Sequence, residues 1–381
     1  MRALFVTNGH GETAIAQRLA DEVLAIAADA QLDHLALVGN LPSRAMRDVG
    51  PRAEMPSGGL IAMGNLQNIA KDVRAGLASL TWRQAGYLRG TRGRYDVAVA
   101  VGDAYALFMT LLTAAPSIFV GTAKSVAVAG YGPFESLILR RARACFARDE
   151  ATAAALRRRG VNAEAANAIA DLIEPAERGA RPLRSGAPAL ALLPGSRESA
   201  YADAAFLLEI VARVAESHPQ LKAALSIAPG LDARVFSRDA QQHGWQVAMT
   251  PDELLPFVLS RQGRQLVGAW RGSLAALLRD ATLVLGQAGT ANEVAAAAGV
   301  PIIAFEEADR RSGRWYRKRQ RGLLGDALAV YPRSLESARA VADLLGDAER
   351  LRRMSEAGKR RLGPPGGAAR IAKRIVAASV T

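Results

Sequence analysis

Cysteine, histidine and aromatic residues are scarce in this sequence of 381 residues. It has one cysteine, four histidines and 5% aromatics. Cys145 has no partner within the chain, which excludes a disulfide-stapled framework and gives no sign of an oxidising compartment. We expect it to be a small buried residue rather than a reactive thiol. Half of the residues are hydrophobic and 22% are charged, so the chain is neither disordered nor fibrous and is long enough for two globular domains.

Lysine is also rare, because only six of the 49 basic residues are lysine and 43 are arginine. The net charge is +13. Arginine pairs well with flat, bidentate anions, so phosphate groups and anionic lipid headgroups are the expected partners. Acidic residues interrupt the basic ones over most of the chain, and no helix-turn-helix, zinc-finger or ribonucleoprotein motif is present. We therefore expect no nucleic-acid partner.

Long apolar runs are absent except for residues 104–123, which carry no charge between Asp103 and Lys124. Pro116 divides this stretch, so the pattern favours a buried helix over Ala104–Ala114 and a strand over Ser117–Gly121 rather than a membrane span. The first residues, MRALFVT, are typical of a strand and not of a signal peptide. We expect a protein that is not exported.

Short runs rich in Val, Ile and Leu alternate with helical patterns, which is typical of βαβ units and parallel sheets. The sequence predicts an α/β fold of two Rossmann-like parallel-sheet domains facing a central cleft, over residues 1–173 and 189–363. A linker, 174–188, separates them, and a C-terminal helix within 364–381 completes the first domain. The expected strands are Ala3–Thr7, His34–Val38, Asp96–Val101, Ser117–Val120, Ala144–Ala147, Ala189–Leu193, Ala223–Ala228, Trp245–Met249, Ala281–Leu285 and Pro301–Phe305, with a helix over Thr13–Ala27.

Two motifs follow predicted strands of the first domain. The glycine loop Asn8-Gly9-His10-Gly11-Glu12 follows the first strand, where glycines allow a tight turn and close approach to a ligand. An ordinary strand-to-helix turn is the alternative, and His10 is either a base or a backbone hydrogen-bond partner. Asp103 ends the strand Asp96–Val101, where it can serve as a proton acceptor, a helix N-cap or both.

Two further motifs lie in the second domain. In Pro194-Gly195-Ser196-Arg197, backbone N–H groups, a hydroxyl and a guanidinium can hold a phosphate or diphosphate at a helix start. In Gly286-Gln287-Ala288-Gly289-Thr290-Ala291-Asn292-Glu293, the Gly289–Thr290 helix start can hold a diphosphate and Glu293 a ribose diol. The alternative for Thr290 and Glu293 is a capping box. Without a GxxxxGK[ST] lysine the sequence is no P-loop NTPase.

The motifs LALLPGSR and GQAGTANE resemble the nucleotide-sugar half of GT-B glycosyltransferases, and most closely the lipid A disaccharide synthase-related proteins. NGHGE, GLIAMGN, VGDAYA and NAIADLI extend the resemblance over most of the chain. It implies that Asp103 is the base and that Ser196, Arg197, Gly289, Thr290 and Glu293 bind the UDP of a UDP-sugar. Gly195 and Gln287, from the same two loops, are expected to contact the UDP-sugar as well.

Two departures limit the resemblance. The order NGHGET, where the synthases have a GETSGD-like order, makes His10 an alternative base. GTAKSVAVAGYG around Lys124 replaces an aromatic stretch of the synthases, so their acyl-sugar acceptor is not carried over.

The resulting hypothesis is an inverting, UDP-sugar-dependent hexosyltransferase with a lipid-linked or membrane-embedded acceptor. No cofactor and no metal are expected, because the sequence has no Asp-x-Asp pair and no histidine cluster. One alternative is a UDP-sugar 2-epimerase, which shares the fold. Another is a non-catalytic GT-B-like protein that binds membranes.

A membrane contact is expected from Gly59–Trp82, in which apolar residues recur at helical spacing with arginines off that face. The matching segment of the synthases contacts the membrane and the acceptor. We therefore expect a cytoplasmic protein held peripherally on the anionic inner face of the cell membrane, with a core-facing helix as the alternative. The expected contact residues are Ile61, Met63, Leu66, Ile69 and Val73. A second basic cluster, Arg310–Arg321, is expected to add an interfacial contact or to be a solvated surface.

Overall fold

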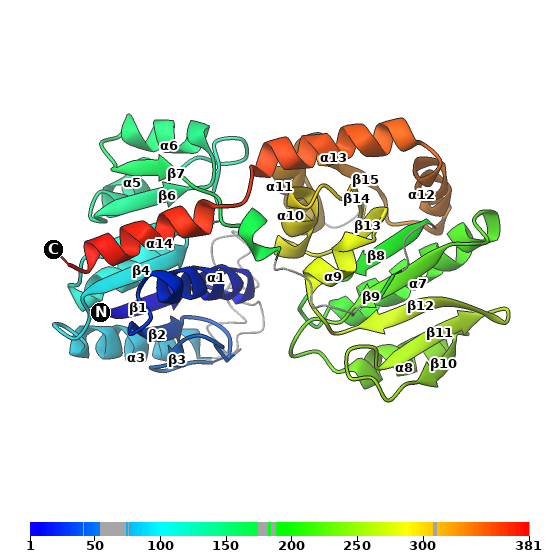
Figure 1. Cartoon of the computed structure of the whole chain (residues 1–381), viewed down its shortest axis with the longest axis horizontal. Coiled ribbons are helices and arrows are strands. Elements are labelled where there is room, and N and C mark those ends of the chain that lie inside the picture. The colour runs from blue at the N-terminus through cyan, green and yellow to red at the C-terminus, as the bar shows by residue number, and fades with distance from the viewer. Residues whose placement is uncertain are drawn as a thin grey trace. The chain divides into compact units, whose positions relative to one another are not determined.

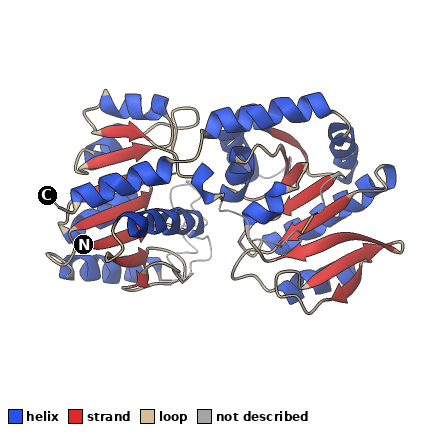
Figure 2. Cartoon of the chain, viewed as in Figure 1, coloured by secondary structure: helices blue, strands red, loops and turns tan. Residues whose placement is uncertain are grey.

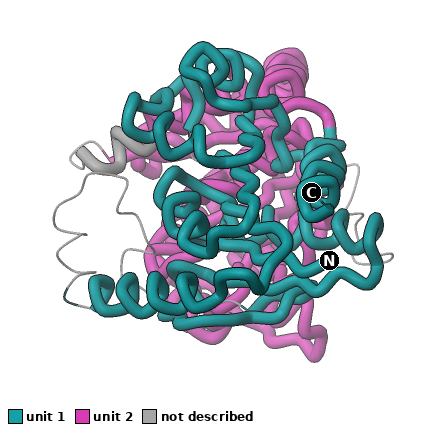
Figure 3. The backbone as a smooth tube through the Cα atoms, turned by 90° about the vertical axis from the view of Figure 1, so that its left-hand side faces the viewer, with its two compact units in different colours: residues 1–172, 365–381 teal, residues 173–364 magenta. Residues whose placement is uncertain are grey.

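The computed structural model describes residues 1–40, 42–53, 74, 76–122, 124–173, 182–183, 188–307 and 311–380. The side chains of His10 and of residues 311–316 are not described. The expected membrane residues Ile61, Met63, Leu66, Ile69 and Val73 and most of the expected linker lie outside the described residues. The chain divides into two compact units, Met1–Leu172 with Pro365–Thr381, and Ile173–Pro364 (Figure 3).

Seven described strands of the first unit form one parallel sheet in the order β3-β2-β1-β4-β5-β6-β7. The strands are β1 (Arg2–Thr7), β2 (Gln31–Ala36), β3 (Arg47–Asp48), β4 (Val97–Gly102), β5 (Ser117–Gly121), β6 (Ala144–Ala147) and β7 (Ala163–Ala165). The helices are α1 (His10–Ile26), α3 (Leu77–Gly90), α4 (Ala104–Thr110), η2 (Leu111–Thr113), α5 (Pro133–Leu139), α6 (Glu150–Arg157), η3 (Ala170–Leu172) and α14 (Gly367–Ala378).

Burial explains the central strands of this sheet. Every residue of β4 is buried, as expected for a strand with helices on both faces. The C-terminal helix α14 packs along α1 and touches β4, so the last residues of the chain complete the first unit (Figure 1). The uncharged stretch after Asp103 forms α4, η2 and β5. Over the part of the chain that the structure describes, no helix is long and apolar enough to cross a membrane.

The second unit holds eight described strands in the order β10-β11-β12-β9-β8-β13-β14-β15. They are β8 (Ala189–Leu193), β9 (Lys222–Ser226), β10 (Gln246–Met249), β11 (Phe257–Arg261), β12 (Arg264–Trp270), β13 (Leu283–Gly286), β14 (Ile302–Glu306) and β15 (Leu328–Pro332). The helices are α7 (Ala200–Ser217), α8 (Ala233–Gln242), α9 (Leu274–Arg279), α10 (Thr290–Ala297), α11 (Arg311–Leu324), η4 (Gly325–Ala327), η5 (Leu335–Ser337), α12 (Ala338–Leu345) and α13 (Ala348–Leu362). Helices cover the sheet of each unit (Figure 2).

An antiparallel edge in the second sheet departs from the expected all-parallel arrangement. Strand β11 pairs antiparallel with both β10 and β12, and only β12 returns to a parallel pairing with β9. Gln262 and Gly263 join β11 to β12 with φ angles of 51° and 73°, the conformation of a tight hairpin turn. The hairpin was not predicted because glutamine is an unusual residue at such a position.

Candidate functional site

The glycine loop begins α1 earlier than expected, because the helix starts at His10 rather than Thr13. Gly9 is its N-cap, with φ 153°, and a Cβ there would lie 2.9 Å from Glu12 Oε2. The backbone conformation therefore favours glycine at this position, and a larger residue would also displace the end of the Glu12 side chain. The side chain of His10 lies outside the described atoms, so its role as a base stays a prediction.

Asp103 lies directly after β4 and holds two neighbours at once. Its Oδ1 accepts a hydrogen bond of 3.0 Å from the Ala106 N–H and so caps α4, while its Oδ2 accepts one of 3.1 Å from Asn8 Nδ2. Burial raises the pKa of the Asp103 carboxyl above its usual range, against hydrogen bonds from Ala106, Tyr105 and Asn8 that lower it. An acid with a raised pKa accepts a proton readily, which suits a general base.

Several polar groups around Asp103 come from the ends of neighbouring strands. Glu12 Oε1 accepts a hydrogen bond of 3.4 Å from Thr122, which follows β5, and Arg148, after β6, donates to the Thr122 carbonyl at 3.0 Å. Lys124 pairs with Glu135 at 2.7 Å. Of these, sequence reasoning named Glu12 as part of the glycine loop and Lys124 as a departure from the synthases. Thr122 and Arg148 were missed. Their positions directly after predicted parallel strands could have indicated them, because the carboxyl ends of such strands share one edge of a sheet.

In the second unit, Gly195 follows β8 with φ 117°, and Ser196 and Arg197 are exposed. Helix α7 does not begin at Ser196 as expected but at Ala200, because a turn over residues 197–200 precedes it, in which the Ala200 N–H donates to the Arg197 carbonyl at 2.8 Å. Any anion here would therefore contact the turn and the Arg197 side chain, not a helix N-terminus.

The loop after β13 is joined to the end of β8. The N–H groups of Gln287 and Ala288 both donate to the Leu193 carbonyl, at 2.8 and 3.1 Å. Gly289 is the N-cap of α10 without a side-chain cap, so Thr290 is the first helical residue and does not act as the cap of a capping box. The N–H groups of Gly289, Thr290 and Ala291 form no hydrogen bond with any described residue. The half-buried Glu293 lies one turn into the helix.

The Gln287 side chain has a structural partner rather than a free end. Its Nε2 donates to the Phe305 carbonyl at 3.2 Å, and its Oε1 accepts from the Phe305 N–H and from Arg317. Arg317 is buried and also donates to the Phe305 carbonyl. Gln320 Nε2 donates to the Ala288 carbonyl at 2.8 Å. Arg317 thus stabilises the loop after β13 through buried hydrogen bonds. The expectation that the cluster Arg310–Arg321 is an interfacial or solvated surface is wrong for this residue.

No protein-family model matches this sequence, and no curated protein matches it either. Solved structures match over the full length. UDP-GlcNAc 2-epimerase from Neisseria meningitidis bound to UDP-GlcNAc superposes with a TM-score of 0.59 at 12% identity, covering 100% of both chains. The glycosyltransferase SnogD from Streptomyces nogalater gives 0.55 at 17%, with 100% and 99% covered. MurG from Acinetobacter baumannii gives 0.54 at 12%, with 99% of each chain covered.

These similarities extend over both units and agree with the two observed sheets. Because the identities are low, they show the fold alone. The chain has the GT-B fold of two Rossmann-like domains that UDP-GlcNAc 2-epimerases and glycosyltransferases share.

Proposed function

We propose that the protein is an inverting glycosyltransferase that moves a sugar from a UDP-sugar to a lipid-linked or membrane-embedded acceptor. The observation that carries this proposal is the junction of two loops on the Leu193 carbonyl. It joins the Gly195–Arg197 turn to the start of α10, where three N–H groups have no partner among the described residues. Arg197, four residues after Leu193, is exposed.

This arrangement suits a diphosphate. Unpaired N–H groups at the start of a helix carry a partial positive charge and donate hydrogen bonds to an anion. The Arg197 guanidinium adds a full charge and two parallel donors. Glu293, one turn further, is the proposed acceptor for the ribose hydroxyls. Structures of the same fold bind UDP-GlcNAc or UDP, which supports a UDP-sugar as the donor.

In the proposed reaction, Asp103 takes the proton from the acceptor hydroxyl, with His10 as the alternative base. The hydroxyl oxygen then attacks the anomeric carbon on the side opposite the diphosphate, and the bond between that carbon and the diphosphate oxygen breaks with inversion. The leaving UDP gains negative charge. Arg197 and the N–H groups at the start of α10 stabilise that charge as it develops, which lowers the barrier.

An apolar surface near Asp103 supports a lipid acceptor. Helix α4, which Asp103 caps, contacts α5. Phe108 of α4 is 50% exposed, and Phe134 and Leu137 of α5 are 75% and 57% exposed. Arg140 and Arg141, at the end of α5, are exposed as well. Large exposed apolar side chains bordered by arginines fit a bilayer with anionic headgroups.

A UDP-sugar 2-epimerase remains the second candidate. The carboxylates of Glu12, Asp103 and Glu135 lie around the ends of β1, β4 and β5, and Glu135 raises the pKa of Asp103 further. Several carboxylates in one site suit proton removal from and return to a sugar carbon. UDP-GlcNAc 2-epimerases are also among the structures of this fold.

One assay separates the two candidates. The protein is incubated with a panel of UDP-sugars, with and without bacterial membrane lipids, and UDP release and the sugar products are followed by NMR. Release that requires the lipids and yields a glycolipid supports the transferase. A new UDP-sugar epimer formed without lipids would replace the transferase with the epimerase.

A further inference from the structure

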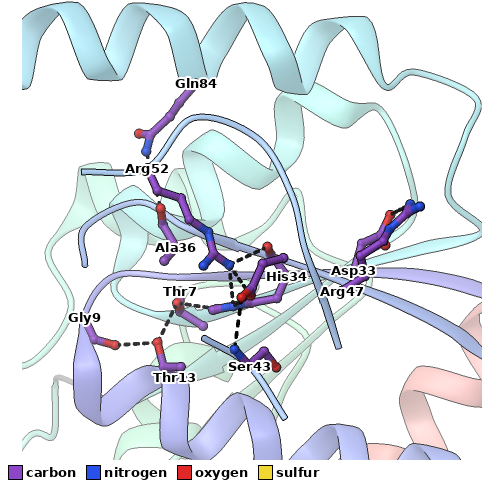
Figure 4. Close-up of polar contacts among 11 residues, drawn as sticks. Thr7, Gly9, Thr13, Asp33, His34, Ala36, Ser43, Arg47, Arg52 and Gln84 are labelled. Atoms are coloured by element: carbon purple, nitrogen blue, oxygen red, sulfur yellow. Dashed lines mark hydrogen bonds and ion pairs between the residues drawn. The ribbon is translucent and has the colours of Figure 1, made fainter. Parts of the chain in front are cut away.

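A chain of side-chain hydrogen bonds runs beneath the glycine loop of the first unit (Figure 4). His34 of β2 contacts Thr7, the last residue of β1, with 2.9 Å between Nε2 and Oγ1. The Thr7 and Thr13 hydroxyl oxygens are 3.1 Å apart, and Thr13 donates to the Gly9 carbonyl at 2.9 Å. The other ring nitrogen of His34 lies 3.2 Å from Arg52 Nη2 and 3.2 Å from Asp48 Oδ1.

The Gly9 carbonyl fixes the direction of this chain, because a carbonyl only accepts. The Thr13 hydroxyl donates its only proton to the Gly9 carbonyl. It must therefore accept a hydrogen bond from the Thr7 hydroxyl. Thr7 in turn accepts from His34, which must carry a proton on Nε2. In neutral His34 the unprotonated Nδ1 then accepts from Arg52, and the contact of Nδ1 with Asp48 is no hydrogen bond, because Asp48 accepts from Arg52 as well. Only when each group donates towards Gly9 do the hydroxyls of Thr7 and Thr13 each donate one hydrogen bond and accept another.

The Asp48, His34 and Thr7 contacts also have the order of a carboxylate–histidine–hydroxyl triad. Thr7 and His34 are both 0% exposed, so no substrate reaches the Thr7 hydroxyl. This excludes a nucleophilic role. The hydrogen bonds do reach the Gly9 carbonyl, and Gly9 directly follows Asn8, whose amide donates to Asp103.

We propose that Thr7 and His34 are positioning residues, which hold the Gly9 carbonyl through Thr13 and thereby fix Asn8 beside the proposed base Asp103 and the backbone of His10 at the start of α1. This inference rests on the proposed role of the glycine loop in transfer. The guanidinium of Arg52 polarises the chain from one end, which strengthens the last hydrogen bond to Gly9. Thr13 also donates its backbone N–H to the Gly9 carbonyl, so loss of the Thr7 hydroxyl leaves both Thr13 donors but frees the Thr13 side chain from β1, which weakens the restraint without touching any group that contacts the substrate.

Thr7→Val and Thr7→Ser test the proposal in the full-length protein. Valine keeps the shape and removes the hydroxyl, whereas serine keeps the hydroxyl. Thr91→Val is the matched control, because Thr91 is an equally buried threonine. It directly follows α3, and its hydroxyl donates to the Leu88 carbonyl within that helix. The readouts are the ring ¹H–¹⁵N NMR signals of the histidines at neutral pH and the steady-state release of UDP from UDP-GlcNAc with membrane lipids.

We expect His34 to carry its proton on Nε2 in the wild type. Thr7→Val should shift the ring signals of both His34 and His10 and lower kcat on the order of 10–100-fold at unchanged KM for UDP-GlcNAc. Thr7→Ser should restore both readouts, and Thr91→Val should change neither. A proton on Nδ1 instead of Nε2 in the wild type, unchanged His10 signals in Thr7→Val, or an equal effect of Thr91→Val would overturn the proposal. If the wild type releases no UDP from any UDP-sugar of the panel described above, the proposed function fails, and the His10 signals alone decide about positioning.

Discussion

Asn8 and Asp103, 95 residues apart in sequence, are joined by a 3.1 Å hydrogen bond from the Asn8 amide to Asp103 Oδ2. The bond links the glycine loop after β1 to the end of β4, the neighbouring strand. Because Oδ1 caps α4 at the same time, both carboxylate oxygens have a defined partner. The proposed base is therefore held in one orientation by two different elements.

Asp103→Asn should separate catalysis from stability. Asparagine also caps helices, and burial disfavours the charge of Asp103, so we expect the free energy of unfolding to change by less than about 1 kcal/mol. Turnover should fall about 10²–10⁴-fold if Asp103 is the base. Urea unfolding and UDP release measure the two effects. Full turnover in Asp103→Asn together with collapse in His10→Ala would assign the base to His10.

Asp149→Asn is the matched control for this experiment. Asp149 caps α6 through the Thr152 N–H at 2.8 Å, in the way that Asp103 caps α4. Burial raises the pKa of Asp149, but hydrogen bonds from Ser125 and Thr152 and the charge of Arg148 outweigh it and hold the pKa below its usual value. The folded state therefore favours the charged form, and Asp149→Asn should lose stability at neutral pH.

His34 should make the protein less stable in mild acid. Burial and the charge of Arg52 lower the pKa of His34 below 6.5, although its contacts with Asp48 raise it. The unfolded chain then binds a proton that the folded chain does not, so stability is present above about pH 6.5 and is lost as pH falls towards the lowered pKa. His34→Gln should flatten this dependence in urea unfolding between pH 7.5 and 5.5. Parallel curves for both proteins would contradict the prediction.

Arg317→Met should weaken the second unit although Arg317 contacts no proposed ligand. The change removes one of the two donors from the carbonyl of Phe305 and from the side-chain oxygen of Gln287, so we expect a loss of about 1–3 kcal/mol in the free energy of unfolding, the scale of hydrogen bonds to a charged group. UDP affinity should fall too, because Gln287 begins the loop. Arg321→Met is the control, since its exposed pair with Glu306 contributes little. Equal effects of the two changes would contradict this account.

The membrane surface is tested by co-sedimentation with anionic and neutral liposomes. Phe134→Ser/Leu137→Ser should lower binding to anionic vesicles at least about tenfold, because two large apolar side chains lose their burial. Leu66→Ser/Ile69→Ser tests the segment outside the described residues in the same way. Ile26→Ser, which changes an exposed residue of α1, should leave binding unchanged. Recovery of the wild type in the soluble fraction with both vesicle types would contradict membrane binding. A transferase with a soluble acceptor, or the epimerase, would then be the better account.

The fold was largely predictable because strands buried on both faces, such as β4 and β8, are continuous apolar runs. The hairpin around Gln262 was missed because its turn lacks the usual Asn-Gly signal. The position of Asp103 directly after β4 was predictable from the apolar run that precedes it, whereas its role as a base stays a prediction. The buried positions of Arg317 and His34 were not, because the polar partners that make such burial favourable come from distant parts of the sequence.

The most direct test of the account is UDP binding by titration calorimetry. Wild-type protein should bind UDP, and Arg197→Ala should weaken binding by about 1.5–3 kcal/mol, the scale of a charged hydrogen bond. Glu293→Ala should also weaken it, whereas Arg213→Ala, which removes another exposed arginine of the second unit, should not. Unchanged UDP affinity in folded Arg197→Ala and Glu293→Ala proteins would contradict the assignment of the donor site, and with it the central claim.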